Sequence, residues 1–145
     1  MKIISACLVG VECRFDGGTR ASATWKRLAA QGGFVPVCPE QLGGLPTPRS
    51  PAEIESGGGE EVLDGKTRVV DVLGVDRTAE HVHGAREVLR IARLVGATEA
   101  ILKERSPSCG CKTLRRGGRT IEGKGVTAAL LEREGIRLVS DEEGL

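Results

Sequence analysis

The sequence has few aromatic residues and few histidines. Its 145 residues include two Phe, one Trp, two His and no Tyr. Proteins that bind single-stranded nucleic acid stack the bases on aromatic side chains, so this composition argues against such a platform. Two histidines also disfavour a histidine-based zinc-hydrolase site, although zinc held by thiolates is not excluded. We expect His81 and His83 to be structural or solvated.

Long apolar runs and an excess of one charge are absent as well. No segment approaches the roughly 18 to 20 apolar residues that cross a bilayer, and the first residues lack the apolar core of a signal peptide. The 21 basic and 20 acidic residues leave a formal charge of +1, which predicts no broad field for nucleic acid or a membrane. We therefore expect one cytoplasmic domain over residues 1–145, with no membrane partner. The sequence does not indicate an oligomeric state.

The chain is instead rich in glycine, with 21 residues, and carries five cysteines. In a reducing compartment, free thiols act as metal ligands or nucleophiles more often than they form disulfides. Three of these thiols each follow a short apolar run that is typical of a buried strand. The apolar run 2–6 precedes Cys7, the run 34–37 precedes Cys38, and the run 99–103 precedes Cys109.

Segments with helical spacing alternate with these strands. We expect helices at 23–31, 78–95 and 126–134, and a last strand at 136–139. This alternation predicts an α/β fold: a Rossmann-like domain with a mostly parallel sheet and helices on both faces. A small hairpin insertion is expected from 61–63 and 68–72, which flank Asp64-Gly65. The stretch 38–51 holds four prolines and should be irregular but rigid, and 112–123 is a polar stretch of Gly and Arg without an assigned element.

Ligands of such folds bind beyond the carboxyl ends of the parallel strands, where the three cysteines should meet. Three thiolates could hold a 4Fe-4S cube and leave one iron without a protein ligand. That iron would be a Lewis acid able to bind sulfur, while a carboxylate such as Glu40 activates water. Cys13 and Cys111 are each a spare ligand, a redox partner or neither. Ser106 and Ser108 are either turn formers or groups that orient a substrate or relay a proton.

Three blocks of sequence carry a resemblance to a known family. They are Ser-Ala-Cys-Leu-Val-Gly at 5–10 with Cys-Arg-Phe-Asp-Gly at 13–17, Cys-Pro-Glu at 38–40 with Gly-Gly-Leu-Pro-Thr-Pro-Arg at 43–49, and Leu-Lys at 102–103 with Ser-Pro-Ser-Cys-Gly at 106–110. Together they resemble the small bacterial domain family, formerly of unknown function, that includes the thiouracil desulfidases. The resemblance covers essentially the whole chain.

The resemblance implies an α/β domain in which Cys7, Cys38 and Cys109 hold an oxygen-sensitive 4Fe-4S cluster. The implied chemistry is non-redox: the sulfur of a thiolated uracil binds the unique iron, water attacks the ring carbon, and sulfide leaves. The acidic residue and the serine that the family uses fall best on Glu40 and Ser106, with Ser108 as the alternative serine. Cys13 and Cys111 are not needed by this scheme.

We therefore predict an iron-sulfur-dependent desulfidase that acts on a small thiolated nucleobase. In this prediction Glu40 is the general acid/base and Ser106 positions the substrate or transfers a proton. Two alternatives remain from the sequence. One is a non-catalytic iron-sulfur or zinc protein with a redox or sensing role. The other is an RNA- or nucleotide-binding domain that uses Arg115, Arg116 and Arg119.

Overall fold

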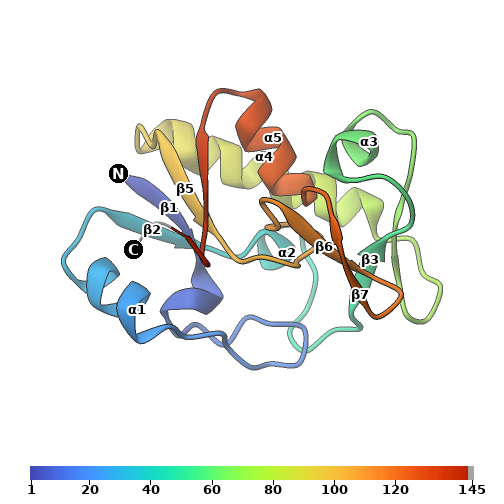
Figure 1. Ribbon diagram of the computed structural model, residues 1–145, viewed down its shortest axis with the longest axis horizontal. Helices are drawn as coiled ribbons and strands as arrows, with labels where there is room; N and C mark the ends of the chain where they lie inside the picture. The colour runs from blue at the N-terminus through green and yellow to red at the C-terminus, as the bar shows by residue number, and fades with distance from the viewer. Residues whose placement is uncertain (144–145) are drawn as a thin grey trace.

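A four-stranded parallel sheet lies at the centre of the computed structural model, which describes residues 1–143 (Figure 1). Its strands, in the spatial order β2-β1-β5-β8, are β2 Phe34–Val37, β1 Lys2–Ser5, β5 Glu99–Leu102 and β8 Arg137–Ser140. Neighbouring strands pair in parallel, with Ile3 opposite both Val35 and Ala100. Each of these four strands agrees with its predicted range to within a residue at either end.

Helices cover both faces of this sheet, as predicted. The helices α4 (Thr78–Leu94) and α5 (Val126–Arg133) pack on one face, where Ile3 and Leu102 enter their shared core. The helix α1 (Ala23–Ala30) and the 3-10 helix η1 (Ala6–Val9) lie on the other (Figure 1). Successive strand residues point to opposite faces, so a sheet covered on both sides needs continuous apolar strands. The α/β Rossmann-like class is confirmed.

Trp25 of α1 packs in the core. It is buried together with Ile4 and Ile101, and its indole N–H donates a hydrogen bond to the carbonyl oxygen of Asp141 at 3.1 Å. The Ser22 hydroxyl caps α1 by accepting the backbone N–H of Trp25. This helix therefore starts where a good N-cap residue precedes its apolar face.

The small antiparallel insertion exists, but only one of its two strands, Val69–Asp71, lies within a predicted range, 68–72. Strand β3 (Ala52–Ile54) pairs with β4 (Val69–Asp71), and the predicted strand 61–63 instead lies in the helix α3 (Gly59–Leu63). The Glu61 carboxylate caps this helix by accepting the backbone N–H of Gly58 at 2.7 Å. The Asp64-Gly65 pair ends the helix rather than making a hairpin turn, since Gly65 has a φ of +75° just past its last turn.

Two further short elements were not expected from the sequence. Residues 112–123 contain a hairpin of β6 (Thr113–Arg116) and β7 (Arg119–Glu122), joined by Gly117-Gly118 with positive φ at both positions. The stretch 38–51 contains one helical turn, α2 (Pro39–Leu42), so its expected irregularity is wrong there. Proline is tolerated at the first helical position because that N–H has no partner within the helix. Among residues 1–143, no helix is both long enough and apolar enough to span a membrane.

Candidate metal centre and active site

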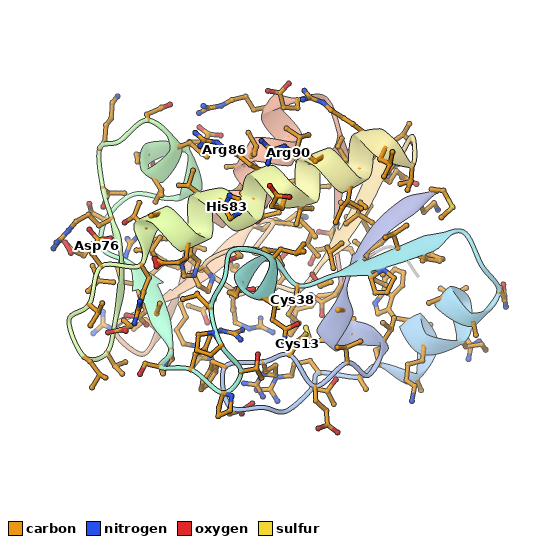
Figure 2. The ribbon with its side chains drawn as sticks, turned by 180° about the vertical axis from the view of Figure 1, so that it is seen from behind. Cys13, Cys38, Asp76, His83, Arg86 and Arg90 are labelled. Carbon is orange, nitrogen blue, oxygen red and sulfur yellow. The ribbon has the colours of Figure 1, made fainter. Side chains whose placement is uncertain are left out.

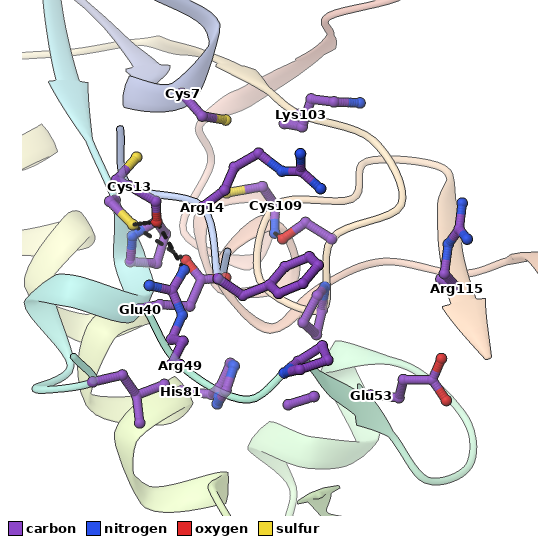
Figure 3. Close-up of a pocket in the computed structure, with 18 of the residues that line it drawn as sticks. Cys7, Cys13, Arg14, Glu40, Arg49, Glu53, His81, Lys103, Cys109 and Arg115 are labelled. Carbon is purple, nitrogen blue, oxygen red and sulfur yellow. Dashed lines mark hydrogen bonds between the residues drawn. The ribbon is translucent and has the colours of Figure 1, made fainter. Parts of the chain in front are cut away.

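A pocket of about 1040 Å³ opens at the carboxyl end of the sheet, and Cys7, Cys38 and Cys109 all line it (Figure 3). Cys7 lies in η1 just after β1, Cys38 joins β2 to α2, and Cys109 lies in the loop that follows β5. The three strands run parallel, so their ends reach the same edge of the sheet. The structure thus brings together the three cysteines that the sequence analysis selected.

A fourth thiol lies in the same pocket. Cys13 is buried there, and the Cys38 thiol donates a hydrogen bond to the Cys13 carbonyl oxygen at 3.7 Å (Figures 2 and 3). Cys111 is also buried but lies against a separate, more open hollow formed with residues 57–59. All five cysteines are free thiols. Cys13 therefore shares the environment of the predicted ligands, whereas Cys111 does not.

The pocket raises the pKa values of several of these thiols. The contact with Cys13 is the largest cause for Cys38, followed by burial, and both raise its pKa. Burial is the largest cause for Cys109, with the Glu40 charge adding to it. For Cys13, the hydrogen bond with Cys38 lowers the pKa, but contact with Cys7, burial and nearby charges raise it to about 11. A bound metal would reverse this preference, because a cation stabilises the thiolate form.

Cationic side chains outnumber carboxylates around the pocket. Seven basic residues line it against four acidic ones: Arg14, Arg20, Arg49, Arg77, Lys103, Arg105 and Arg115 against Glu40, Glu53, Asp71 and Glu104. The whole chain carries a formal charge of only +1, so this excess is local. A site that gathers thiolates needs such charges, because opposite charge nearby favours the ionised form.

The loops that carry the cysteines are tied to one another. The Arg49 side chain donates a hydrogen bond from Nη2 to the Cys13 carbonyl oxygen at 2.9 Å, and its backbone N–H donates to the Phe15 carbonyl oxygen at 2.7 Å. At the other side, the Lys103 backbone N–H donates to Oγ of Ser5 at 3.0 Å, joining the end of β5 to the end of β1. The pocket walls therefore hold together without disulfides.

Glu40 lies in α2, two residues after Cys38, and lines the pocket (Figure 3). Its Oε2 accepts a hydrogen bond from the Cys38 thiol at 3.5 Å. The helix α2 rests directly on the backbone of α4, because a Cβ on Gly84 would lie 2.0 Å from the Pro39 carbonyl oxygen. A Cβ on Gly43 would likewise lie 2.0 Å from the Glu80 carbonyl oxygen. Two glycines thus permit the close contact that places Glu40.

The two candidate serines have different surroundings. Ser106 lines the pocket, and its Oγ accepts the backbone N–H groups of Ser108 and Cys109 at 3.1 and 3.0 Å. Its own O–H therefore remains a donor. Ser108 does not line the pocket; it is fully buried, and its Oγ has no hydrogen-bond partner. Ser106 forms the turn before Cys109 and also faces the pocket. Its surroundings are therefore compatible both with a turn-forming role and with contact to a substrate.

Residues 1–143 contain no group of three or more His, Cys, Asp or Glu side chains that could hold a single metal ion. A 4Fe-4S cube binds each thiolate to a different iron and so requires ligands that surround a space. The arrangement of thiols around the pocket suits a cluster site better than a single-metal site. The donor chemistry also fits, because soft thiolates are the usual ligands of iron-sulfur clusters.

Sequence reasoning did not identify several residues of the pocket lining. Asp71 and Glu53 line it from the small β3–β4 sheet, and the buried His81 lines it from α4. The Nδ1 of His81 lies 2.8 Å from the Arg77 carbonyl oxygen, so a structural role is consistent with its surroundings. His83 is exposed on the outer side of α4 (Figure 2). Only the turn-forming sequence Asp-Val-Leu-Gly after β4 could have pointed to Asp71.

Comparison with known proteins agrees with this geometry. The model of the 2-thiouracil desulfurase family matches residues 3–143. The chain therefore belongs to the 2-thiouracil desulfurase family. This confirms the resemblance that the three sequence blocks indicated.

Two known proteins match nearly the whole chain. The uncharacterised protein YbbK of Bacillus subtilis (strain 168) is 44% identical over 146 residues, covering 99% of this chain and 97% of YbbK. The solved structure of the 4Fe-4S-dependent thiouracil desulfidase TudS (DUF523Vcz) matches with a TM-score of 0.84 and 41% identity. The match covers 97% of this chain and 89% of TudS. TudS thus shares the α/β fold described above.

Proposed function

We propose that this protein is an iron-sulfur enzyme that removes sulfur from a small thiolated nucleobase. The observation that carries the proposal is one pocket lined by Cys7, Cys38 and Cys109 together with Glu40 and Ser106. Membership of the 2-thiouracil desulfurase family and the likeness to TudS support an enzyme of the thiouracil desulfidase type with a 4Fe-4S cluster.

Cys7, Cys38 and Cys109 are the residues that would hold the cluster. They come from three strand ends and surround the pocket, whereas Cys111 lies outside it. The basic lining, including Arg14 and Lys103, compensates the charge of three thiolates. When bound, the cluster supplies a Lewis-acidic iron with an open position for a soft sulfur ligand.

The reaction needs one water and no electrons. Oxygen from water replaces sulfur on the ring carbon, and both water protons leave with the sulfur as hydrogen sulfide, which then releases one proton to solvent where it ionises. Glu40 accepts a proton from the attacking water and returns it to the departing sulfur, a general acid/base role for which its place beside Cys38 is suitable. Ser106 donates its free O–H to the heteroatoms of the base and so fixes the orientation of the ring.

The RNA-binding alternative depends on three arginines, and one of them is held by hydrogen bonds within the protein. Arg116 donates hydrogen bonds to the carbonyl oxygens of Ile54 and Gly57, so it anchors the β6–β7 hairpin to the neighbouring segment. Only Arg115 and Arg119 of the three remain as exposed cations. Arg115 lines the pocket, where it adds to the local positive charge.

A cysteine-by-cysteine replacement series tests the ligand assignment. Each variant with Ser at position 7, 38 or 109 should lose most of its iron and acid-labile sulfide after anaerobic reconstitution. Cys111→Ser is the matched control, because Cys111 is buried outside the pocket. Cys13→Ser should retain the brown chromophore and about four irons per chain. Loss of iron in Cys13→Ser with retention in one of the three proposed ligands would contradict the assignment.

A further inference from the structure

Glu104 is a buried carboxylate that the proposed reaction does not use. The residue is only 3% exposed and lies two positions after the end of β5 at Leu102. The next nine residues form the loop that carries Ser106 and Cys109 into the pocket and then return to β6 at Thr113. A buried carboxylate at the base of a ligand-bearing loop requires a physical reason, because burial disfavours its charge.

One oxygen of Glu104 accepts hydrogen bonds from the far end of this loop. Its Oε1 accepts the backbone N–H groups of three consecutive residues, Cys111 at 2.9 Å, Lys112 at 3.1 Å and Thr113 at 3.2 Å. The Thr113 hydroxyl donates to the same oxygen at 3.1 Å. Successive backbone N–H groups form an anion-binding concavity, and the anion bound here is the Glu104 carboxylate.

Other contacts fix Glu104 to the sheet. Its backbone N–H donates to Oδ1 of Asp141, just beyond β8, at 2.8 Å. The next N–H, from Arg105, donates to the Thr113 carbonyl oxygen at 3.2 Å, so the two ends of the loop lie side by side. Between them the turn is tight, since a Cβ on Gly110 would lie 2.2 Å from that same carbonyl oxygen. The loop that presents Cys109 is thus closed at its base.

We propose that Glu104 is a positioning residue of the cluster site, whose carboxylate closes the loop so that Cys109 faces the pocket before any cluster binds. The ligand role of Cys109 in this inference rests on the proposed function. The carboxylate is charged at neutral pH: burial alone would raise the pKa of Glu104, but hydrogen bonds from Ser140, Lys112 and Thr113 outweigh it and lower the pKa. Replacing the carboxylate by an amide leaves three backbone donors and one hydroxyl with an uncharged, weaker acceptor.

The first test uses the cluster-free protein, so that it does not depend on catalysis. Alkylation of Cys109 by N-ethylmaleimide is followed by mass spectrometry in the wild type and in Glu104→Gln. Cys109 is buried, so it reacts only when its loop opens. Loss of the charged acceptor should raise the Cys109 alkylation rate by about tenfold or more.

The matched control is Glu142→Gln. Glu142 is an exposed carboxylate that pairs with Arg105 of the same loop, at 2.7 Å, but does not touch residues 111–113. Its replacement should leave the Cys109 alkylation rate within about twofold of the wild type, as expected for a surface ion pair. A wild-type rate in a Glu104→Gln protein with native circular dichroism would overturn the proposal. If Glu104→Gln does not fold, Thr113→Val, which removes one donor to Oε1, decides instead: a raised rate supports the proposal and a wild-type rate overturns it.

The second test uses the reconstituted protein. Glu104→Gln should lose its cluster to an iron chelator several-fold faster than the wild type, and the electron paramagnetic resonance spectrum of the reduced cluster should change shape. Unchanged loss rate and spectrum would overturn the proposal at this level. If the wild type itself takes up no cluster, the proposed function fails, whereas the alkylation experiment still decides the role of Glu104.

Discussion

Side chains of the same type have different surroundings in this pocket. Glu40 and Glu53 both line the pocket, but only Glu40 touches a cysteine thiol, through Oε2 and Cys38 Sγ. Ser106 and Ser108 are separated in the same way, because only Ser106 lines the pocket. The sequence placed Glu40 beside Cys38 by simple adjacency, and the choice between the serines required the buried environment of Ser108.

The replacement of Glu40 by Gln separates catalysis from cluster binding. Glu40→Gln should keep the iron content of the wild type and lower kcat on 2-thiouracil by about 10²- to 10⁴-fold, the usual contribution of a general acid/base. Steady-state kinetics on the reconstituted protein measures this effect. Glu12→Gln is the control, since Glu12 is an exposed carboxylate next to Cys13 that does not line the pocket. A kcat for Glu40→Gln close to that of the wild type would rule out the assigned role.

Asp71 accepts the backbone N–H groups of Leu73 and Val75 in the turn between β4 and α4. The backbone N–H of Val75 is the largest cause that lowers the pKa of Asp71, and the N–H of Leu73 and the Arg77 side chain add to it against the effect of burial. A carboxyl whose pKa is lower in the folded state than its ordinary 3.8 stabilises the fold above that pH and loses this contribution as the pH falls.

We therefore expect Asp71→Asn to lower the urea midpoint of unfolding at pH 7. The difference from the wild type should shrink steadily as the pH falls below 3.8. Urea titrations at several pH values, followed by circular dichroism, measure this difference. A gap that is constant with pH would show that the charge of Asp71 contributes nothing.

At the scale of elements, long periodic segments were predictable and short ones were not. The helix α4 and the four parallel strands carry apolar patterns that only one structure satisfies. The Asp64-Gly65 pair is compatible with a hairpin turn and with a helix end, and the contact of Glu61 with Gly58 decided for the helix. The β6–β7 hairpin was not predicted because its strands carry mostly Arg and Thr, although Gly117-Gly118 is a favoured two-residue turn.

The contact between α2 and α4 provides a prediction at this scale. Gly84→Ala inserts a Cβ 2.0 Å from the Pro39 carbonyl oxygen, so α2 must move with Cys38 and Glu40. We expect a loss of about 1–3 kcal/mol in the free energy of unfolding, typical of overpacking. We also expect kcat to fall, because Glu40 moves with α2. Arg86→Ala on the exposed side of the same helix is the control (Figure 2). Wild-type stability and kcat in Gly84→Ala would show that this contact does not place Glu40.

Over the whole molecule, the sequence predicted that Cys7, Cys38 and Cys109 line one pocket, because the ends of parallel strands meet at one edge. It could not locate Glu104 or the Arg49–Cys13 contact, because these join residues whose proximity depends on how the loops fold. The single domain over 1–145, which extends two residues beyond the described range, and the cytoplasmic location both stay predictions.

Because the proposed ligands come from three separate segments, cluster binding should stabilise the whole fold. A group that binds only the folded state raises the melting temperature, and we expect an increase of at least about 5 °C for the reconstituted over the cluster-free protein. Anaerobic thermal unfolding measures this shift. Cys109→Ser should show no such increase, and equal melting temperatures for both forms of the wild type would contradict ligands drawn from all three segments.

The most direct measurement is the stoichiometry of the reaction without a reductant. Anaerobically reconstituted protein is incubated with 2-thiouracil and, separately, with 4-thiouracil, and uracil and sulfide are quantified over many turnovers. We predict equal amounts of uracil and sulfide from at least one of the two bases, with a rate proportional to the iron content of the preparation. Absence of uracil and sulfide from a protein that carries a full cluster, or turnover that is independent of iron, would contradict the proposed desulfidase.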